Sequence, residues 1–211
     1  IRPSGAVYDP AVTSSAAPCV IAIDAGTTGV RSRAVFTDDS PVVASYREFT
    51  QFYPEPGWVE HDANEIWDAV VATLNEVISR VGRERVQAIG ITNQRETVLA
   101  WNRSTGEPYG TAIVWQDRRT AGICDQLEAD GHLPLVRERT GLVLDPYFSG
   151  TKFGWLLANR DIPVDDRGHR GVVSGEDLTA CRVVADGEQG RHRLRRRRGD
   201  VETTDRVLAI R

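Results

Sequence analysis

The pattern of apolar and polar positions begins as a series of strands. Residues 19–23 are a continuous apolar run that ends in Asp24 and Gly26, which is typical of a buried strand followed by a tight turn. Strand patterns return over residues 33–36 and 42–49, with an Asp-Asp-Ser-Pro turn sequence between them. These three segments predict an antiparallel meander.

A long amphipathic helix is predicted next. Asp62 is a candidate N-cap, Glu65 follows it at capping-box spacing, and Gly82 marks the end of the pattern. The apolar residues in between recur at the spacing of one helical face, so we expect them to pack in the core: Ile66, Trp67, Val70, Val71, Leu74, Val77, Ile78 and Val81.

Short strands and helices alternate in the following segment. Strands are expected over residues 86–92, 97–101 and 112–115, and helices over residues 117–129 and 152–158. This order of elements predicts an α/β domain with a mixed sheet and flanking helices.

Composition and charge separate the C-terminal part from the rest. The chain has 211 residues, 40% of them hydrophobic and 27% charged, which is typical of a globular protein. Its net charge of −4 argues against a surface built for nucleic acid. Residues 151–211 nevertheless hold 13 basic and 10 acidic side chains, with no aromatic residue after Trp155. We therefore expect an irregular C-terminal part, whose arginine cluster at 191–198 has no aromatic platform for nucleic acid.

The cysteines and the N-terminus bear on the cellular compartment. Cys19, Cys124 and Cys181 show no CxxC pairing, so neither a zinc site nor a disulfide framework is indicated, and a reducing cytoplasm is expected. No apolar run of 18 residues occurs, so we expect no membrane span. Residues 1–18 lack an initial Met and are rich in Ala, Ser and Pro, which predicts a disordered leader.

A glycine- and threonine-containing turn is the first candidate site. Backbone N–H groups near Gly29 and the hydroxyls of Thr27 and Thr28 could bind an anion, with Arg31 neutralising phosphate charge. Asp24 could hold hydrated Mg²⁺. The alternative is an ordinary β-turn. A Walker loop is excluded, because no GxxxxGK[ST] sequence occurs.

A second group of residues could recognise a small polyol. Arg95 would donate to vicinal hydroxyls and Glu96 would accept from them, while Trp115 forms an apolar wall and Tyr147 completes the hydrogen bonding. The alternatives are that residues 92–96 form a solvated hairpin loop and that the two aromatic residues belong to the core.

Six motifs within about residues 19–157 point to a known family, and they lie at residues 23–28, 53–62, 89–97, 112–120, 140–142 and 145–152. On these motifs the chain resembles the glycerol kinases of the FGGY carbohydrate kinase family. The resemblance implies a ribonuclease-H-like domain of the actin-like ATPase superfamily. It also implies ATP and Mg²⁺ as cofactors and glycerol as the substrate, with ADP and glycerol 3-phosphate as products.

The resemblance assigns roles to matching positions. Nucleotide phosphates would be contacted by Thr27, Thr28, Gly29 and Arg31, and Asp24 would be the Mg²⁺-linked catalytic acid. The resemblance places glycerol against Arg95, Glu96, Trp115 and Tyr147.

The similarity also has limits. Family members are considerably longer and take their catalytic base from an Asp in a Gly-Asp-Gln motif that has no equivalent here. We therefore expect a family N-terminal domain over 19–158, a divergent or frame-shifted tail over 159–211, no second kinase domain, and an inactive fragment. The alternatives are a non-catalytic remnant, a half-protein that self-associates or needs a separate second domain, and another FGGY sugar kinase.

Overall fold

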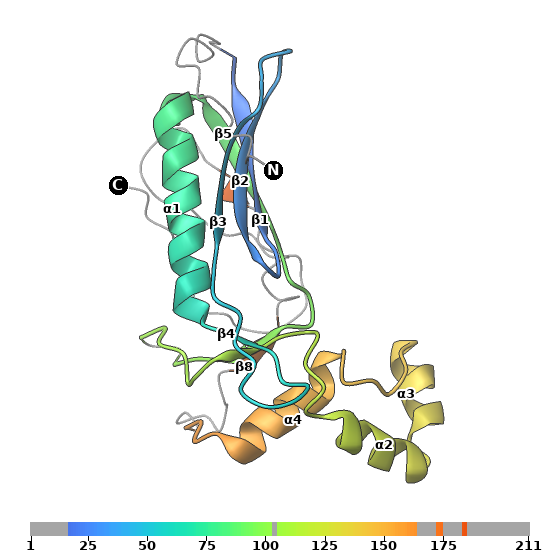
Figure 1. Cartoon of the computed structure of the whole chain (residues 1–211). Coiled ribbons are helices and arrows are strands. Elements are labelled where there is room, and N and C mark those ends of the chain that lie inside the picture. The colour runs from blue at the N-terminus through green and yellow to red at the C-terminus, as the bar shows by residue number, and fades with distance from the viewer. Residues whose placement is uncertain (1–16, 103–104, 164–171, 175–182, 185–211) are drawn as a thin grey trace, which may run out of the picture.

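The fold consists of two sheets that follow one another along the molecule. The computed structural model describes residues 17–102, 105–163, 172–174 and 183–184. A long sheet with one long helix forms the upper part in Figure 1, and a smaller sheet with three helices forms the lower part.

The upper sheet is mixed, as predicted. Its strand order is β3-β2-β1-β5-β9, where the strands are β1 (Cys19–Ala25), β2 (Gly29–Phe36), β3 (Val43–Glu48), β5 (Val86–Asn93) and β9 (Val183–Val184). Strands β1 to β3 pair antiparallel, which confirms the meander, and β1 pairs parallel with β5. This register places Asp24 opposite Arg31 and beside Thr92.

Helix α1 (Ala63–Val81) covers one face of this sheet. Asp62 caps it by accepting from the N–H of Asn64 at 2.8 Å, and Gly82 ends it at a φ of 89°. Glu65 does not complete a capping box. Its carboxylate instead accepts from the N–H of Thr50 at 2.8 Å, so it ties the helix to the segment that leads into it.

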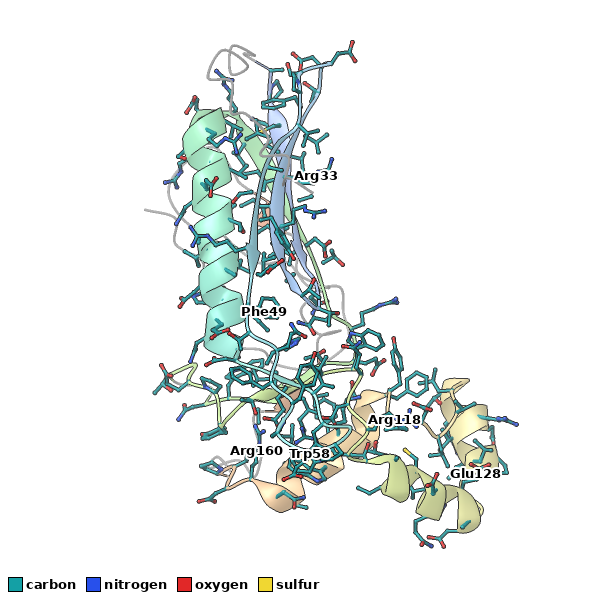
Figure 2. All side chains as sticks on the ribbon, in the orientation of Figure 1. Arg33, Phe49, Trp58, Arg118, Glu128 and Arg160 are labelled. Carbon is teal, nitrogen blue, oxygen red and sulfur yellow. The ribbon has the colours of Figure 1, made fainter. Side chains whose placement is uncertain are left out.

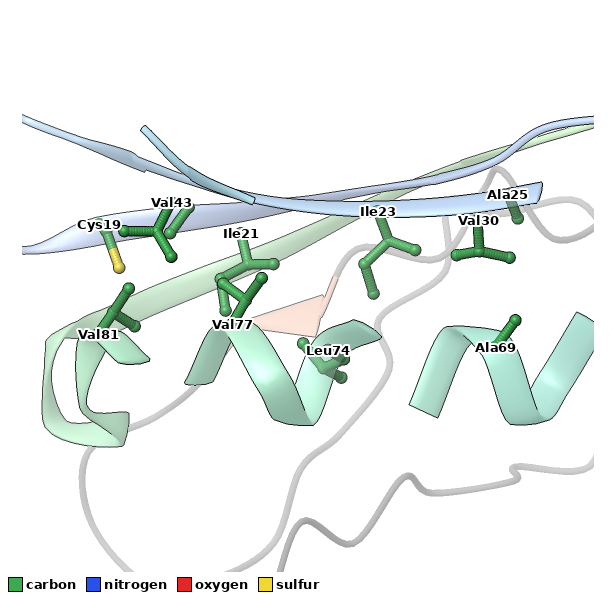
Figure 3. Close-up of a cluster of buried hydrophobic side chains, with 11 residues drawn as sticks. Cys19, Ile21, Ile23, Ala25, Val30, Val43, Ala69, Leu74, Val77 and Val81 are labelled. Atoms are coloured by element: carbon green, nitrogen blue, oxygen red, sulfur yellow. The ribbon is translucent and has the colours of Figure 1, made fainter. Parts of the chain in front are cut away.

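The upper core lies between α1 and the strands, as Figure 3 shows. Its buried helix side chains are Ala69, Leu74, Val77 and Val81, and its buried strand side chains include Cys19, Ile21, Ile23 and Val30. The prediction that Trp67 packs in this core is wrong, because its side chain is 44% exposed. Trp67 lies at the margin of the stripe, about 100° around the helix from Ile66.

The lower part is built on a second sheet with the order β4-β7-β6-β8. These strands are β4 (Glu60–His61), β7 (Ala112–Ile113), β6 (Val98–Ala100) and β8 (Val172–Ser174). The helices are α2 (Ala121–Ala129), α3 (Leu133–Thr140) and α4 (Ser149–Asn159), and the 3₁₀ helix η2 (Arg83–Arg85) precedes β5. The core of this lower part consists of Val98, Ala100, Ile113, Leu156 and Ile162.

A buried arginine organises the lower part. The Arg119 guanidinium lies 3.8 Å from the ring centroid of Trp58 and 4.6 Å from that of Trp155. It also forms ion pairs with Glu60 at 2.7 Å and Asp117 at 2.8 Å. Figure 2 shows Trp58 in this lower part, beside α4. The aromatic faces and the two carboxylates replace most of the water that a buried guanidinium loses, and Nη1 is left without a hydrogen-bond partner.

Several elements differ from the predictions. Helix α2 begins at Ala121 rather than 117, because residues 114–120 form turns, and α4 begins three residues earlier than expected. Helix α3 and strand β4 were not predicted. Helix α3 buries none of its residues, and β4 is only two residues long.

Two short strands, β8 and β9, occur in the C-terminal part, which was expected to be irregular. Residues 1–16 and the arginine cluster at 191–198 lie outside the described residues. No helix in the described ranges is long and apolar enough to cross a membrane.

Leu74 allows a test of the upper core. We expect Leu74→Ala to lower the free energy of unfolding by about 2–5 kcal/mol, because it leaves a cavity at a side chain that is only 3% exposed. Urea denaturation measures this change. The control is Leu135→Ala on α3, where the side chain is 53% exposed. Equal losses in the two variants would contradict the core described here.

Candidate active site

The turn between β1 and β2 is the first part of the site. Gly26 donates its N–H to the carbonyl of Gly29 at 3.0 Å, which closes the turn around Thr27 and Thr28. The Arg31 guanidinium lies 5.2 Å from the ring centroid of Tyr46, and the Tyr46 hydroxyl lies 3.5 Å from Oγ1 of Thr28. Exposed polar groups therefore surround a turn in which Thr28 is exposed and Gly26 and Thr27 are half-buried.

Gly29 has a packing role in this turn. A Cβ built on it would lie 2.5 Å from the Arg47 carbonyl oxygen and 2.6 Å from the Tyr46 hydroxyl. Because both neighbours lie on β3, the absence of a side chain allows β2 and β3 to approach here. Of the predicted phosphate contacts, Gly29 can therefore contribute its backbone alone.

Substitution of Gly29 tests this close approach. We expect Gly29→Ala to destabilise the fold by about 1–3 kcal/mol, the usual cost of overpacking. The matched control is Gly90→Ala on β5, where no atom lies within 4 Å of the added Cβ and stability should be unchanged or slightly higher. Thermal unfolding of both variants measures the difference. A stable Gly29→Ala protein would show that the turn does not need this glycine.

A pocket of about 230 Å³ is the second part of the site. It is lined by Asn93, Arg95, Trp115 and Tyr147. The Trp115 and Tyr147 rings meet edge to face, with 5.8 Å between their centroids. Trp115 also donates its indole Nε1–H to Oγ1 of Thr27 at 3.0 Å, so a wall of the pocket is bonded directly to the turn.

Residues 92–96 are not a hairpin loop. They end β5 in the upper sheet and lead to β6 in the lower sheet, and the two strands do not pair. Within this crossing Glu96 has a φ of 63°, the only positive φ outside glycine among the described residues. Its carboxylate accepts from both the N–H and the hydroxyl of Ser149 at 2.7 Å, and thereby holds the first residue of α4. Glu96 is 8% exposed and is not among the side chains that line the pocket.

Lys152 fixes the loop that carries Tyr147. Its fully buried side chain reaches back from α4, and Nζ donates to the carbonyls of Pro146 at 2.8 Å, Phe148 at 3.0 Å and Tyr147. Burial lowers the pKa of Lys152 to about 8, partly offset by the nearby carboxylate of Glu96. The side chain thus remains largely protonated at neutral pH, as three donated hydrogen bonds require.

A buried histidine lies beneath the turn. His61 is fully buried, and its ring contacts Gln51 through Nε2 at 2.9 Å and Gln94 through Nδ1 at 3.1 Å. Burial lowers the pKa of His61 to about 4, although the carboxylate of Glu65 acts in the opposite direction. The imidazole is therefore neutral at physiological pH.

His61 predicts a specific acid sensitivity. Between pH 6.5 and pH 4 the unfolded chain protonates this histidine and the folded chain does not, so falling pH favours unfolding by about 3 kcal/mol. We expect the stability difference between the wild type and His61→Gln to narrow over this range. Urea denaturation at pH 7, 5.5 and 4 measures it. If the difference in the free energy of unfolding between the two proteins were the same at all three pH values, the buried ring of His61 would not be neutral.

The structure unites some predicted site residues and separates others. Arg95, Trp115 and Tyr147 share the pocket, and Thr27 joins it through Trp115. Asp24, Thr28 and Arg31 are exposed at the turn or the adjoining strand ends. Asn93 was not assigned a role from the sequence, although it lies in the same polar motif. His61 and Gln94 also lie in the motifs that carry the resemblance, whereas no sequence signal pointed to Gln51.

The residues near the turn fit a weakly ligated magnesium ion. The described part of the chain contains no group of three or more His, Cys, Asp or Glu side chains arranged to hold a metal. Mg²⁺ commonly retains several waters and binds through one or two carboxylates together with substrate phosphates. The exposed carboxylate of Asp24, at the end of β1, suits that mode of binding.

Comparison with known proteins defines the family. Residues 19–164 match the model for the N-terminal domain of the FGGY family of carbohydrate kinases. The chain therefore belongs to this family. It is 55% identical over 141 residues to a glycerol kinase of Geobacillus kaustophilus and 51% identical over 157 residues to one of Thermus thermophilus. These matches cover 65% and 73% of the chain, but only 28% and 31% of the relatives.

Solved structures agree with this assignment. A glycerol kinase of Plasmodium falciparum with ADP aligns with a TM-score of 0.63 and 32% identity, covering 68% of this chain and 29% of that one. A gluconate kinase of Lactobacillus acidophilus aligns with a TM-score of 0.66 at 17% identity, covering 78% and 32% respectively. The second similarity concerns the fold alone. Both confirm the expected actin-like kinase fold.

Proposed function

We propose that this chain provides the glycerol-binding and phosphate-binding half of an ATP-dependent glycerol kinase. One observation carries the proposal, namely the hydrogen bond from Trp115 in the pocket to Thr27 in the turn. Phosphoryl transfer requires an acceptor hydroxyl next to the phosphate that is transferred. A polyol pocket bonded directly to a phosphate-binding turn meets that requirement.

The pocket suits a molecule of the size and polarity of glycerol. The Trp115 ring offers an apolar wall for carbon-bound hydrogens, and Arg95 supplies donors for hydroxyl oxygens. The Tyr147 hydroxyl and the Asn93 amide supply both donors and acceptors. The resemblance also assigns Glu96 as a hydroxyl acceptor, next in the chain to Arg95, although its carboxylate holds Ser149 and does not line the pocket in this structure. Such a site disfavours molecules without matching hydroxyls, since its own polar groups would be left unpaired.

The turn supplies the groups for the nucleotide phosphates. Thr27 and Thr28 offer hydroxyls and backbone N–H groups, Gly29 offers its backbone, and Arg31 offers positive charge. Asp24 would hold Mg²⁺, which neutralises charge on the transferring phosphoryl group when bound. In the reaction the terminal hydroxyl oxygen of glycerol bonds to the γ-phosphorus of ATP, and the bond from that phosphorus to the bridging oxygen of ADP breaks. The hydroxyl proton must pass to a base. The family's Gly-Asp-Gln motif does not occur in these 211 residues, so we assign binding rather than proton transfer to this chain.

Glycerol binding tests the pocket assignment. We expect Arg95→Leu and Tyr147→Phe to weaken glycerol binding roughly tenfold, because each leaves a polyol hydroxyl without a partner. The controls are Arg33→Leu on β2 and Tyr53→Phe, whose side chains are exposed outside the pocket. An NMR titration that follows the Trp115 indole signal measures affinity. Tighter binding of the five-carbon polyol xylitol would indicate another FGGY sugar kinase instead.

A further inference from the structure

We propose that Gln51, His61 and Gln94 form a polar relay that positions the candidate phosphate-binding turn. The relay lies beneath the turn and contacts the backbone carbonyls of two consecutive residues, Gly26 and Thr27. This inference rests on the proposed function, because it assigns the relay a role in presenting the turn to phosphate.

The direction of each hydrogen bond in the relay can be inferred from the two backbone carbonyls, which can only accept. The amide Nε2 of Gln51 donates to the carbonyl of Thr27 at 2.7 Å, so its Oε1 faces His61 and accepts from the ring Nε2–H. A neutral ring protonated on Nε2 has an acceptor at Nδ1. Gln94 donates to that acceptor and, with its second amide hydrogen, to the carbonyl of Gly26 at 3.2 Å. The tautomer of His61 that is protonated on Nε2 therefore gives both ring nitrogens a partner.

The relay determines which backbone groups the turn exposes. In a trans peptide the C=O and N–H groups point in opposite directions. When the carbonyls of Gly26 and Thr27 point toward the relay, the N–H groups of Thr27 and Thr28 point away from it. Two consecutive N–H groups on one side of a turn form an anion-binding nest. The relay thus selects the turn conformation that suits phosphate.

The same relay extends to the polyol pocket. The Gln94 Oε1 accepts from the hydroxyl of Thr97 at 3.0 Å, and that hydroxyl accepts from the backbone N–H of Trp115 at 3.3 Å. Since the Trp115 side chain bonds back to Thr27, the hydrogen bonds form a closed ring through both halves of the site. His61 is packed in place by Phe49, whose ring lies 4.9 Å away edge to face. Figure 2 shows Phe49 where the two parts of the molecule meet.

The tautomer of His61 is the first test. With ¹⁵N-labelled histidine in the 211-residue chain at pH 7, we expect NMR to show a neutral ring with its proton on Nε2. A proton on Nδ1 would overturn the relay, because Nδ1–H would then face the Gln94 amide N–H instead of accepting from it.

Anion binding is the second test, with inorganic pyrophosphate as the probe. Gln51→Glu places a carboxylate against the Thr27 carbonyl, and Gln51→Met removes the hydrogen bond without adding charge. We expect both to weaken pyrophosphate binding roughly tenfold and to shift the amide signals of Thr27 and Thr28. The matched control is Gln87→Glu on the same strand as residues 92–93, where the side chain is exposed and binding should change less than twofold. Urea denaturation of each variant confirms that it is folded.

The outcomes separate this inference from the proposed function. If the wild-type chain does not bind pyrophosphate, the phosphate-binding role of the turn fails and the relay's role fails with it. If the wild type binds and folded Gln51→Glu and Gln51→Met bind equally well, only the relay is overturned. If both variants lose affinity and the control does not, the relay positions the turn.

Discussion

The hydrogen-bonded polar groups around the buried His61, at the junction of the two sheets, are the constraint on which this structure depends. The turn after β1 belongs to the upper sheet, His61 belongs to the lower sheet, and Gln94 lies in the crossing between them. A buried donor or acceptor without a partner costs about 1–3 kcal/mol, so the fully buried ring of His61 requires Gln51 and Gln94 in place. These hydrogen bonds therefore connect the turn of the upper sheet to a strand of the lower sheet.

A second polar cluster supports β4, the strand that carries His61. Arg119 pairs with Glu60, which immediately precedes His61, and Arg160 lies 3.8 Å from the same carboxylate. The adjacent Asp117 also accepts from the N–H of Val59 at 2.6 Å. These contacts fix the short strand β4, and β4 in turn places the imidazole between Gln51 and Gln94, which hold the turn. Charge pairs of this kind contribute to geometry more surely than to net stability.

The sequence predicted the elements whose signals are local and periodic. The meander and α1 follow from apolar spacing, Asp62 and Gly82, and all were confirmed. Helix α3 has no buried stripe, so periodicity could not reveal it. Trp67 shows the opposite error, because an apolar residue at helical spacing can still lie at the margin of the buried face. Such failures arise where tertiary contacts, rather than the local pattern, decide whether a helix forms or a side chain is buried.

The candidate site was predictable in its parts but not in its connections. The motifs identified Thr27, Arg95, Trp115 and Tyr147, yet spacing could not show that Trp115 bonds to Thr27 across 88 positions. It also could not show that Glu96 holds Ser149, or that Gln51 supports the turn.

A crystal structure of the chain with glycerol and ADP would test the central claim most directly. The account predicts glycerol between Arg95, Trp115 and Tyr147, and phosphate oxygens on the N–H groups of Thr27 and Thr28. Glycerol outside this pocket, or phosphates bound away from the turn while the Trp115 to Thr27 hydrogen bond is intact, would contradict it.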